Sequence, residues 1–217
     1  MRKETVLAVV FCAALALFAV SAQASYVVFD DLATSGGFGA VPSTYQGYQW
    51  TGFGVVSQQY YNATYGNAIT FPSGPNAAYN DGGAVVTMTG TGTPFIFNGA
   101  DFWSWTMGPA ITGGLSTYYL HVTGSLNGVP LPAEQLIDLT INPGAPQLTH
   151  FAPTEFGWLV DKVMFTTDAQ GGGGYWLMDC VNVAAAPAVP LPPSLYLLAA
   201  GLVGTLVARR RKAHDLT

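Results

Sequence analysis

Three aspartates carry the clearest potential for metal chemistry in this sequence. Asp30 and Asp31 end an early run of β-forming residues, and Asp179 lies in the last such run before position 188. If the first and last strands of the fold are neighbours, these carboxylates meet, and carboxylates with backbone carbonyls suit Ca²⁺. The sequence therefore predicts a structural calcium ion at Asp30, Asp31 and Asp179. The alternative is that Asp30 and Asp31 face solvent or cap a turn, while Asp179 bonds to loop amides.

Tyrosines form the second candidate site, because sugars stack on flat rings while a few polar groups fix their orientation. Tyr60, Tyr61 and Tyr65 lie in the polar, Asn-rich stretch 58–67, which indicates a loop rather than core. We therefore expect these three residues to form an exposed carbohydrate-binding platform. Four tryptophans lie within predicted strands instead, where they are expected in the core: Trp103, Trp105, Trp158 and Trp176.

Catalytic motifs are missing from the sequence, which contains no Gly-x-Ser-x-Gly, no His-Glu-x-x-His, no phosphate loop and no paired-Cys metal site. Cys180 is the only cysteine outside the first 24 residues, and we expect it to be a small buried hydrophobe, the alternative being a reactive or intermolecular thiol. A carboxylate pair could hydrolyse a glycoside, but ten acids on one domain supply some pair by chance. The sequence therefore predicts a protein that is not an enzyme.

Charge narrows the choice of partners. Lys162 is the only Lys or Arg between positions 25 and 188, against ten Asp and Glu, so this part of the chain carries a formal charge of −9. Nucleic acid is excluded as a partner, because binding to phosphates needs Lys and Arg. Anionic polysaccharide is disfavoured for the same reason. A neutral glycan remains open, as does an acidic glycan bridged by divalent cations.

The elements that must position these residues are predicted to be strands. Short β-forming runs alternate with turn residues, and no amphipathic helix is expected between the two ends of the chain. Asn127 and Gly128 predict a hairpin turn. The predicted strands are 26–29, 48–56, 84–89, 94–97, 100–105, 116–123, 136–141, 158–166 and 175–183. This pattern is typical of an all-β fold, here a single antiparallel β-sandwich.

The N-terminus has the parts of a secretory signal peptide. Met1, Arg2 and Lys3 make a positive start, an apolar run follows, and Ala22 and Ala24 form the small-x-small site for cleavage before Ser25. Domain boundaries follow as a signal peptide at 1–24 and a β-sandwich domain at 25–188.

The C-terminal tail, 189–217, contains a proline-rich start, an uncharged apolar stretch over 195–208 and a basic cluster. A helix over that stretch, counted from Val189, approaches the roughly 20 residues that a membrane span requires. The basic cluster holds this end on the cytoplasmic side, so the domain lies outside. Its residues are Arg209, Arg210, Arg211 and Lys212. An ordinary C-terminal anchor is the alternative interpretation.

The order of these parts resembles the VPLPA-type variant of PEP-CTERM sorting signals. The residues that carry the resemblance are Val189, Pro190, Leu191 and Pro192, followed by Ser194, the span and the arginines. Pro193 stands where the variant usually has Ala. The resemblance implies a Gram-negative bacterium that secretes exopolysaccharide, and an exosortase, a membrane-embedded cysteine protease, that processes the tail. The protein would be anchored transiently in the inner membrane and then reach the cell surface or the medium.

The domain also resembles the β-sandwich domains that often precede such tails, which are similar to the galactose-binding jelly roll of carbohydrate-binding modules. The resemblance rests on segments 29–32, 123–128 and 176–181, although Cys180 departs from the common closing pattern Asp-Asn-Val. It implies a jelly-roll-like sandwich. Two functions stay open: a non-catalytic surface or matrix protein that binds exopolysaccharide in a biofilm, or a structural or adhesive protein that contacts other proteins without recognising sugar.

Overall fold

A computed structural model describes the chain from Ala24 to Ala186, with gaps. The described stretches are 24–65, 69–83, 85–105, 119–132, 134–139, 149–152, 157–167 and 174–186. The predicted sorting segment 189–217, and the predicted signal peptide up to residue 23, lie outside these stretches. Within them, no helix combines the length and the apolar character needed to cross a membrane.

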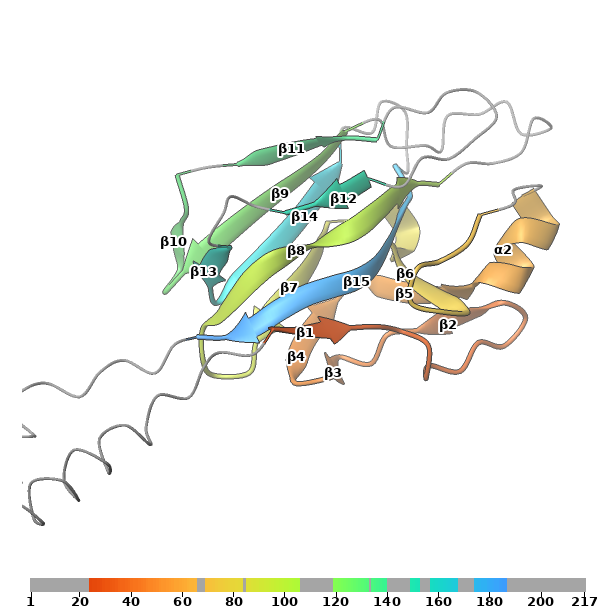
Figure 1. Cartoon of the computed structure of the whole chain (residues 1–217), viewed down its shortest axis with the longest axis horizontal. Coiled ribbons are helices and arrows are strands. Elements are labelled where there is room, and N and C mark those ends of the chain that lie inside the picture. The colour runs from red at the N-terminus through yellow and green to blue at the C-terminus, as the bar shows by residue number, and fades with distance from the viewer. Residues whose placement is uncertain are drawn as a thin grey trace, which may run out of the picture. The chain divides into compact units, whose positions relative to one another are not determined.

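Two antiparallel sheets form a β-sandwich (Figure 1). Sheet A has the order β12-β8-β15-β6-β5-β2, with β1 also paired to β15 and β13 to β8. Its strands are β1 (Ala24–Val27), β2 (Phe38–Ala40), β5 (Phe53–Ser57), β6 (Asn76–Asn80), β8 (Phe95–Ser104), β12 (Thr149–Phe151), β13 (Trp158–Val160) and β15 (Trp176–Ala185).

Sheet B has the order β10-β9-β14-β7-β4-β3, with β11 also paired to β9. Its strands are β3 (Thr44–Tyr45), β4 (Tyr48–Thr51), β7 (Val86–Gly90), β9 (Tyr119–Leu126), β10 (Val129–Pro130), β11 (Gln135–Asp138) and β14 (Lys162–Thr167). Two short helices complete the described elements, α2 (Gln58–Tyr65) and the 3-10 helix η1 (Asp81–Gly83).

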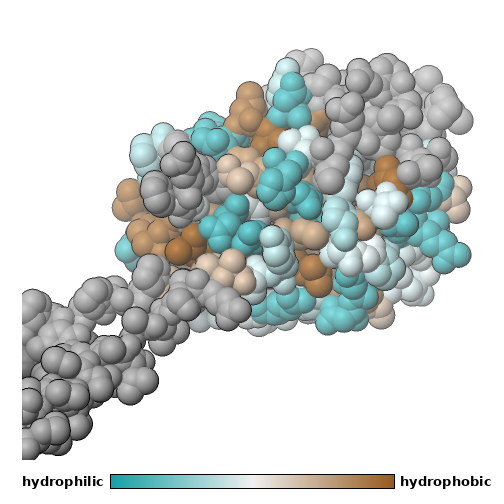
Figure 2. Space-filling model, in the orientation of Figure 1, coloured by the Kyte–Doolittle hydropathy of each residue, from teal (hydrophilic) through white to brown (hydrophobic). Residues whose placement is uncertain are grey.

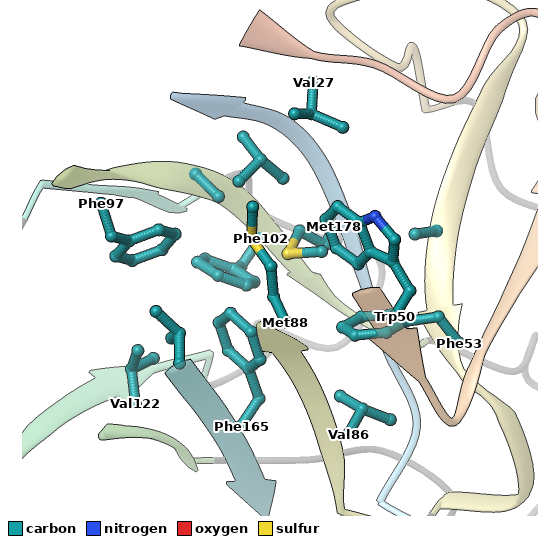
Figure 3. Packing of buried hydrophobic residues seen from close by; sticks show 14 of the residues in the cluster. Val27, Trp50, Phe53, Val86, Met88, Phe97, Phe102, Val122, Phe165 and Met178 are labelled. Atoms are coloured by element: carbon teal, nitrogen blue, oxygen red, sulfur yellow. The ribbon is translucent and has the colours of Figure 1, made fainter. Parts of the chain in front are cut away.

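The central core lies between the two sheets, because alternate residues of each strand point inward. In β9 the side chains of Leu120 and Val122 are fully buried, whereas His121 between them is half-buried on the outer face. Figure 3 shows Phe97 and Phe102 of sheet A directed toward Phe165 of sheet B. The ring centroids of Phe102 and Phe165 are 5.9 Å apart. Interdigitation of large rings from both sheets therefore closes the sandwich.

The first and last described strands are neighbours, which is the condition on which the calcium prediction depended. β1 pairs antiparallel with β15, with Ala24 opposite Ala184 and Val27 opposite Val181. In Figure 1, β15 runs beside β8 across the middle of the sandwich, and β1 lies along its other side. The two ends of the described chain therefore leave from one corner of sheet A.

The predicted all-β sandwich and most of its strands are confirmed. The hairpin at Asn127 and Gly128 is confirmed too, since both residues have positive φ, 53° and 75°, as a tight two-residue turn requires. The predicted strand 48–56 is instead two strands, because Gly52 with φ 80° turns the chain from sheet B into sheet A. The predictions for 94–97 and 100–105 merge into the single strand β8.

Candidate functional site

A second hydrophobic cluster lies on the outer face of sheet A. Consecutive residues of one strand point to opposite faces, and here they divide between two clusters. Val55 and Phe102 belong to the central core, whereas their neighbours Val56 and Trp103 belong to the second cluster. The other buried members of this cluster are Tyr61, Ile69, Phe71, Ala77, Tyr79, Trp105 and Leu177. Sheet A is therefore buried on both faces in this region.

The helix α2 covers this outer cluster. Its first turn is capped by the Ser57 hydroxyl oxygen, which accepts a hydrogen bond from the Tyr60 amide at 3.3 Å. Side chains of the helix hold the returning chain, because Asn62 bonds both backbone groups of Ile69 and Gln58 accepts from the Phe71 amide at 2.7 Å. The helix and the segment after it are thus fixed to each other above the sheet.

Trp105, at the end of β8, lies at the centre of an aromatic group. Its exposed fraction is 3%, and five other rings surround it. The centroid distances from Trp105 are 5.0 Å to Tyr61, 5.2 Å to Tyr65, 5.4 Å to Tyr79, 5.9 Å to Tyr175 and 6.2 Å to Phe38. Helix α2, strands β2 and β6, and the residues directly after β8 and directly before β15 all contribute, so the group exists only in the folded domain.

The outer rings of this group keep part of their surface in solvent. Phe38, Tyr65 and Tyr175 are half-buried, and Tyr79 is 9% exposed. Tyr60, whose ring centroid lies 4.9 Å from that of Phe38, is half-buried too. Asp81 is exposed and accepts a hydrogen bond from the Tyr79 hydroxyl. We call these residues the aromatic surface: Phe38, Tyr60, Tyr65, Tyr79, Asp81, Trp105 and Tyr175. Over the part of the molecule where α2 lies, Figure 2 shows hydrophilic and hydrophobic residues interspersed.

The tyrosine hydroxyls of the aromatic surface interact with one another. Burial raises the pKa of Tyr79 to about 12, helped by the charge of Asp81 and by Tyr175 and Tyr65. Burial is also the main cause that raises the pKa of Tyr65, with smaller contributions from neighbouring tyrosines that include Tyr175. The hydroxyls of Tyr79 and Tyr65 therefore stay protonated at neutral pH and can act as hydrogen-bond donors and acceptors.

Two glycines allow the rings to approach the backbone. A Cβ atom on Gly54 would lie 2.4 Å from ring carbons of Tyr79, which stands opposite it in β6. A Cβ atom on Gly37 would lie 1.9 Å from the first ring carbon of Tyr60, and this glycine also has φ 91°. Any larger residue at either position displaces a ring of the aromatic surface.

The predicted tyrosine platform is corrected in one respect and extended in another. The stretch is helical, and Tyr61 is fully buried against Trp105, so it offers no ring to solvent. Tyr60 and Tyr65 do reach the aromatic surface. Sequence analysis missed Tyr79, Tyr175 and Asp81 as their companions. The spacing of Tyr61 and Tyr65 was the available signal, because residues four apart share one face of a helix. All four tryptophans expected in the core are buried.

The three aspartates of the predicted calcium site accept hydrogen bonds from protein donors. Asp30 accepts from the Asn76 amide at 3.2 Å, and Asp31 accepts from the Tyr45 hydroxyl. Asp179 is fully buried in β15 and accepts from the amide and hydroxyl of Ser73, at 2.9 and 2.7 Å. Across the described stretches, no three His, Cys, Asp or Glu residues are grouped as a metal ion needs. Calcium binding stays a prediction.

Cys180 has an unusual backbone. Its φ is 48°, at a break in the pairing of β15 with β8, and its thiol is bonded to Asp101. Asp101 in turn lies 2.6 Å from Nδ1 of His150. Burial, followed by the charges of Asp179 and Asp101, raises the pKa of the Cys180 thiol to about 12. The thiol therefore stays protonated and is a poor nucleophile, although it is half-buried rather than buried as predicted.

Comparisons with known proteins identify no family. No protein-family model matches the chain, and no curated protein sequence matches it. Among solved structures, the chain is similar to a family 29 carbohydrate-binding module, with 13% identity and a TM-score of 0.37 over 75% of this chain and 93% of that one.

Two further similarities have lower TM-scores. The Stig cyclase Fisc from Fischerella sp. TAU has 17% identity and a TM-score of 0.32 over 76% of this chain and 90% of that one. An F5/8 type C domain from Bacteroides fragilis has 12% identity and a TM-score of 0.29 over 71% of this chain and all of that one.

Proposed function

We propose that this protein binds carbohydrate without catalysis, through the aromatic surface around Trp105. The observation that carries the proposal is the convergence of half-buried tyrosine rings with their hydroxyls and the carboxylate of Asp81. A sugar presents apolar C–H faces that stack on rings and hydroxyls that need donors and acceptors. Tyr65 and Tyr175 offer the rings, while Asp81 and Tyr79 offer the polar atoms.

The charge of the domain supports a ligand without acidic groups. Lys162, the only Lys or Arg between positions 25 and 188, lies in β14 of sheet B, opposite Thr89 and Ser125 of the neighbouring strands. The aromatic surface thus contains no cation to pair with a carboxylate or sulfate group of a polysaccharide. Nucleic acid is excluded on the same physical ground.

A pull-down with insoluble polysaccharides and a glycan array test the binding. The full chain is purified in a detergent without a sugar head group, because such a head group would compete. Tyr175→Ala and Tyr65→Ala are each expected to weaken retention by about tenfold, the loss of one stacking contact of roughly 1.4 kcal/mol. Tyr26→Ala is the matched control, since Tyr26 is 59% exposed on β1, away from α2. Absence of binding to every glycan leaves the structural or adhesive function standing.

Calcium is tested in the same assay. The ion proposed at Asp30, Asp31 and Asp179 predicts that retention and the unfolding temperature are higher in about 1 mM CaCl₂ than in EDTA, because an ion that binds only the folded chain stabilises it. Equal values in both buffers would mean that the protein donors alone satisfy the three carboxylates.

We also propose that the chain is exported and sorted by an exosortase, after transient anchoring in the inner membrane, and acts with exopolysaccharide at the cell surface or in the matrix of a biofilm. The support is the order of motif, apolar stretch and basic cluster in the tail 189–217. The finer assignment of the sandwich as jelly-roll-like belongs to the same proposal and rests on the sequence resemblance.

A further inference from the structure

The aromatic surface is acidic and contains no cation. Asp81 follows β6 directly, within η1, and its carboxylate stands in solvent beside the Tyr79 hydroxyl. One hydrogen bond from Tyr79 leaves most of the acceptor positions of this carboxylate unused, because an ionised carboxylate offers about four. Phe38, Tyr60, Tyr65 and Tyr175 supply ring faces or edges but no positive charge. An approaching ligand therefore meets one negative charge and several π-systems.

Both features attract the same chemical group. An ammonium group within about 6 Å of a ring centroid is drawn to the negative face of the ring, by roughly 0.5 to 2 kcal/mol. A carboxylate adds a charge-assisted hydrogen bond, which is about twice as strong as a neutral one. The surrounding domain reinforces this preference, because its formal charge of −9 draws cations toward its whole surface. A carboxylate-bearing sugar is repelled by the same charges.

We infer that the ligand of the aromatic surface is a polysaccharide with free amino groups, whose ammonium binds Asp81 beside the tyrosine rings. This deepens the carbohydrate-binding function proposed above and rests on it. The sugar rings stack on Tyr65 and Tyr175, and the amine sets the preference among sugars. Acetylation of the amine removes its charge and leaves an amide, so the acetylated polymer keeps the stacking contacts and loses the ion pair.

Three oligosaccharides of equal length test the inference on the full chain in detergent: β-1,4-linked glucosamine, its N-acetylated form and the neutral glucan. The assay is run at about pH 6, where the glucosamine amines are protonated. We expect the glucosamine oligomer to bind at least about tenfold more tightly than the other two, with a preference that shrinks as salt is raised from about 0.01 to 0.15 M.

Asp81→Asn separates a local ion pair from the general charge of the domain. This variant is expected to reduce the preference for glucosamine to about twofold and to keep the binding of the acetylated and neutral oligomers. Asp138→Asn removes the same charge from β11 of sheet B, where Asp138 is exposed, and is expected to keep the preference. Circular dichroism confirms that both variants are folded.

The outcomes are distinguishable. Equal binding of the three oligomers by the wild type, or an equal loss of preference in both variants, overturns the amino-sugar inference and leaves the carbohydrate-binding function intact. Binding of none of the oligomers, together with an empty glycan array, overturns both.

Discussion

The ring of Tyr79 lies directly against Gly54, the residue paired with it in the neighbouring strand. A Cβ atom at position 54 would come within 2.4 Å of two ring carbons and 2.7 Å of the hydroxyl oxygen. Tyr79 also contacts Trp105 and bonds to Asp81. Because position 54 has no side chain, the Tyr79 ring can pack directly on the backbone of sheet A, and the rest of the aromatic surface packs around it.

Gly54→Ala is therefore expected to destabilise the domain by about 1 to 3 kcal/mol, the usual range for overpacking, and to weaken sugar binding because the Tyr79 ring must move. Urea unfolding and a pull-down measure the two effects. In a Tyr79→Ala background the same substitution should cost much less, since the clash is gone. Equal costs in the two backgrounds would show that the contact has no energetic importance.

Asp179 makes the stability of the domain depend on pH. Burial is the main cause that raises its pKa above 3.8, against the opposing effect of its bonds to Ser73. The Asp179 carboxyl therefore binds its proton more tightly in the folded chain than in the unfolded chain. The stabilisation from this group is complete below about pH 3.8 and is lost as pH rises through the higher folded pKa.

Asp179→Asn removes this titrating group. The free energy of unfolding of the variant should therefore rise relative to that of the wild type as pH rises from 3.8 toward neutrality. Ser73→Ala removes a donor at 2.7 Å, which should raise the pKa of Asp179 further and make the loss steeper. Urea unfolding across this pH range checks both. A difference between wild type and Asp179→Asn that stays constant with pH contradicts the assignment.

Cys180 should resist alkylation. With a pKa of about 12, only about one thiol in ten thousand is ionised at pH 8, compared with about a quarter for an ordinary cysteine. Mass spectrometry of the Cys180 peptide after iodoacetamide treatment measures the rate, which we expect to be at least about a hundredfold below that of a free thiol. Asp101→Asn removes a bonded carboxylate, so it lowers the pKa and should accelerate the reaction. Rapid labelling of the wild type would refute the assignment.

The sorting proposal predicts a difference in location. In a host that contains an exosortase, the wild type should be released from the membrane, whereas a variant with Pro190→Ala and Pro192→Ala should stay in the membrane fraction. Immunoblots of membrane, cell-surface and medium fractions report this. If both proteins are released equally, the tail acts without the proline motif and the proposal is wrong.

Sequence patterns predicted the sandwich because several strands alternate clearly. In β9 and β14 the inward residues are Leu120, Val122, Val163 and Phe165, and the less buried His121 and Met164 stand between them. β6 has no such alternation, since its sequence NAAYN is buried on both faces. Helix α2 was missed because its residues QQYYNATY favour no helix by composition. It is held by the Ser57 cap and by packing on sheet A, neither of which a local pattern contains.

The candidate site was only half predictable for a related reason. Tyr60 and Tyr65 could be predicted because they are close in sequence and lie in one polar stretch. Tyr175 and Tyr79 reach the same place through the pairing of β15 with β6, where Leu177 stands opposite Tyr79. That register joins segments almost a hundred residues apart and is set by the whole sheet. The carboxylates of the calcium prediction accept hydrogen bonds from residues that are distant in sequence: Asn76 in β6, Tyr45 in β3 and Ser73 in a loop.

Because β1 pairs with β15, sheet A can be completed only late in the folding of the chain. Ser25 bonds to Val183 across 158 positions of sequence, so the first described strand can pair only after the last one has been made. Contacts of such long range slow folding and leave strand edges open meanwhile. For an exported chain, the first strand would emerge on the far side of the membrane and remain unpaired until translocation was nearly finished. If the proposed export is right, periplasmic chaperones that shield open β-edges are expected to bind the nascent domain before its final strand arrives.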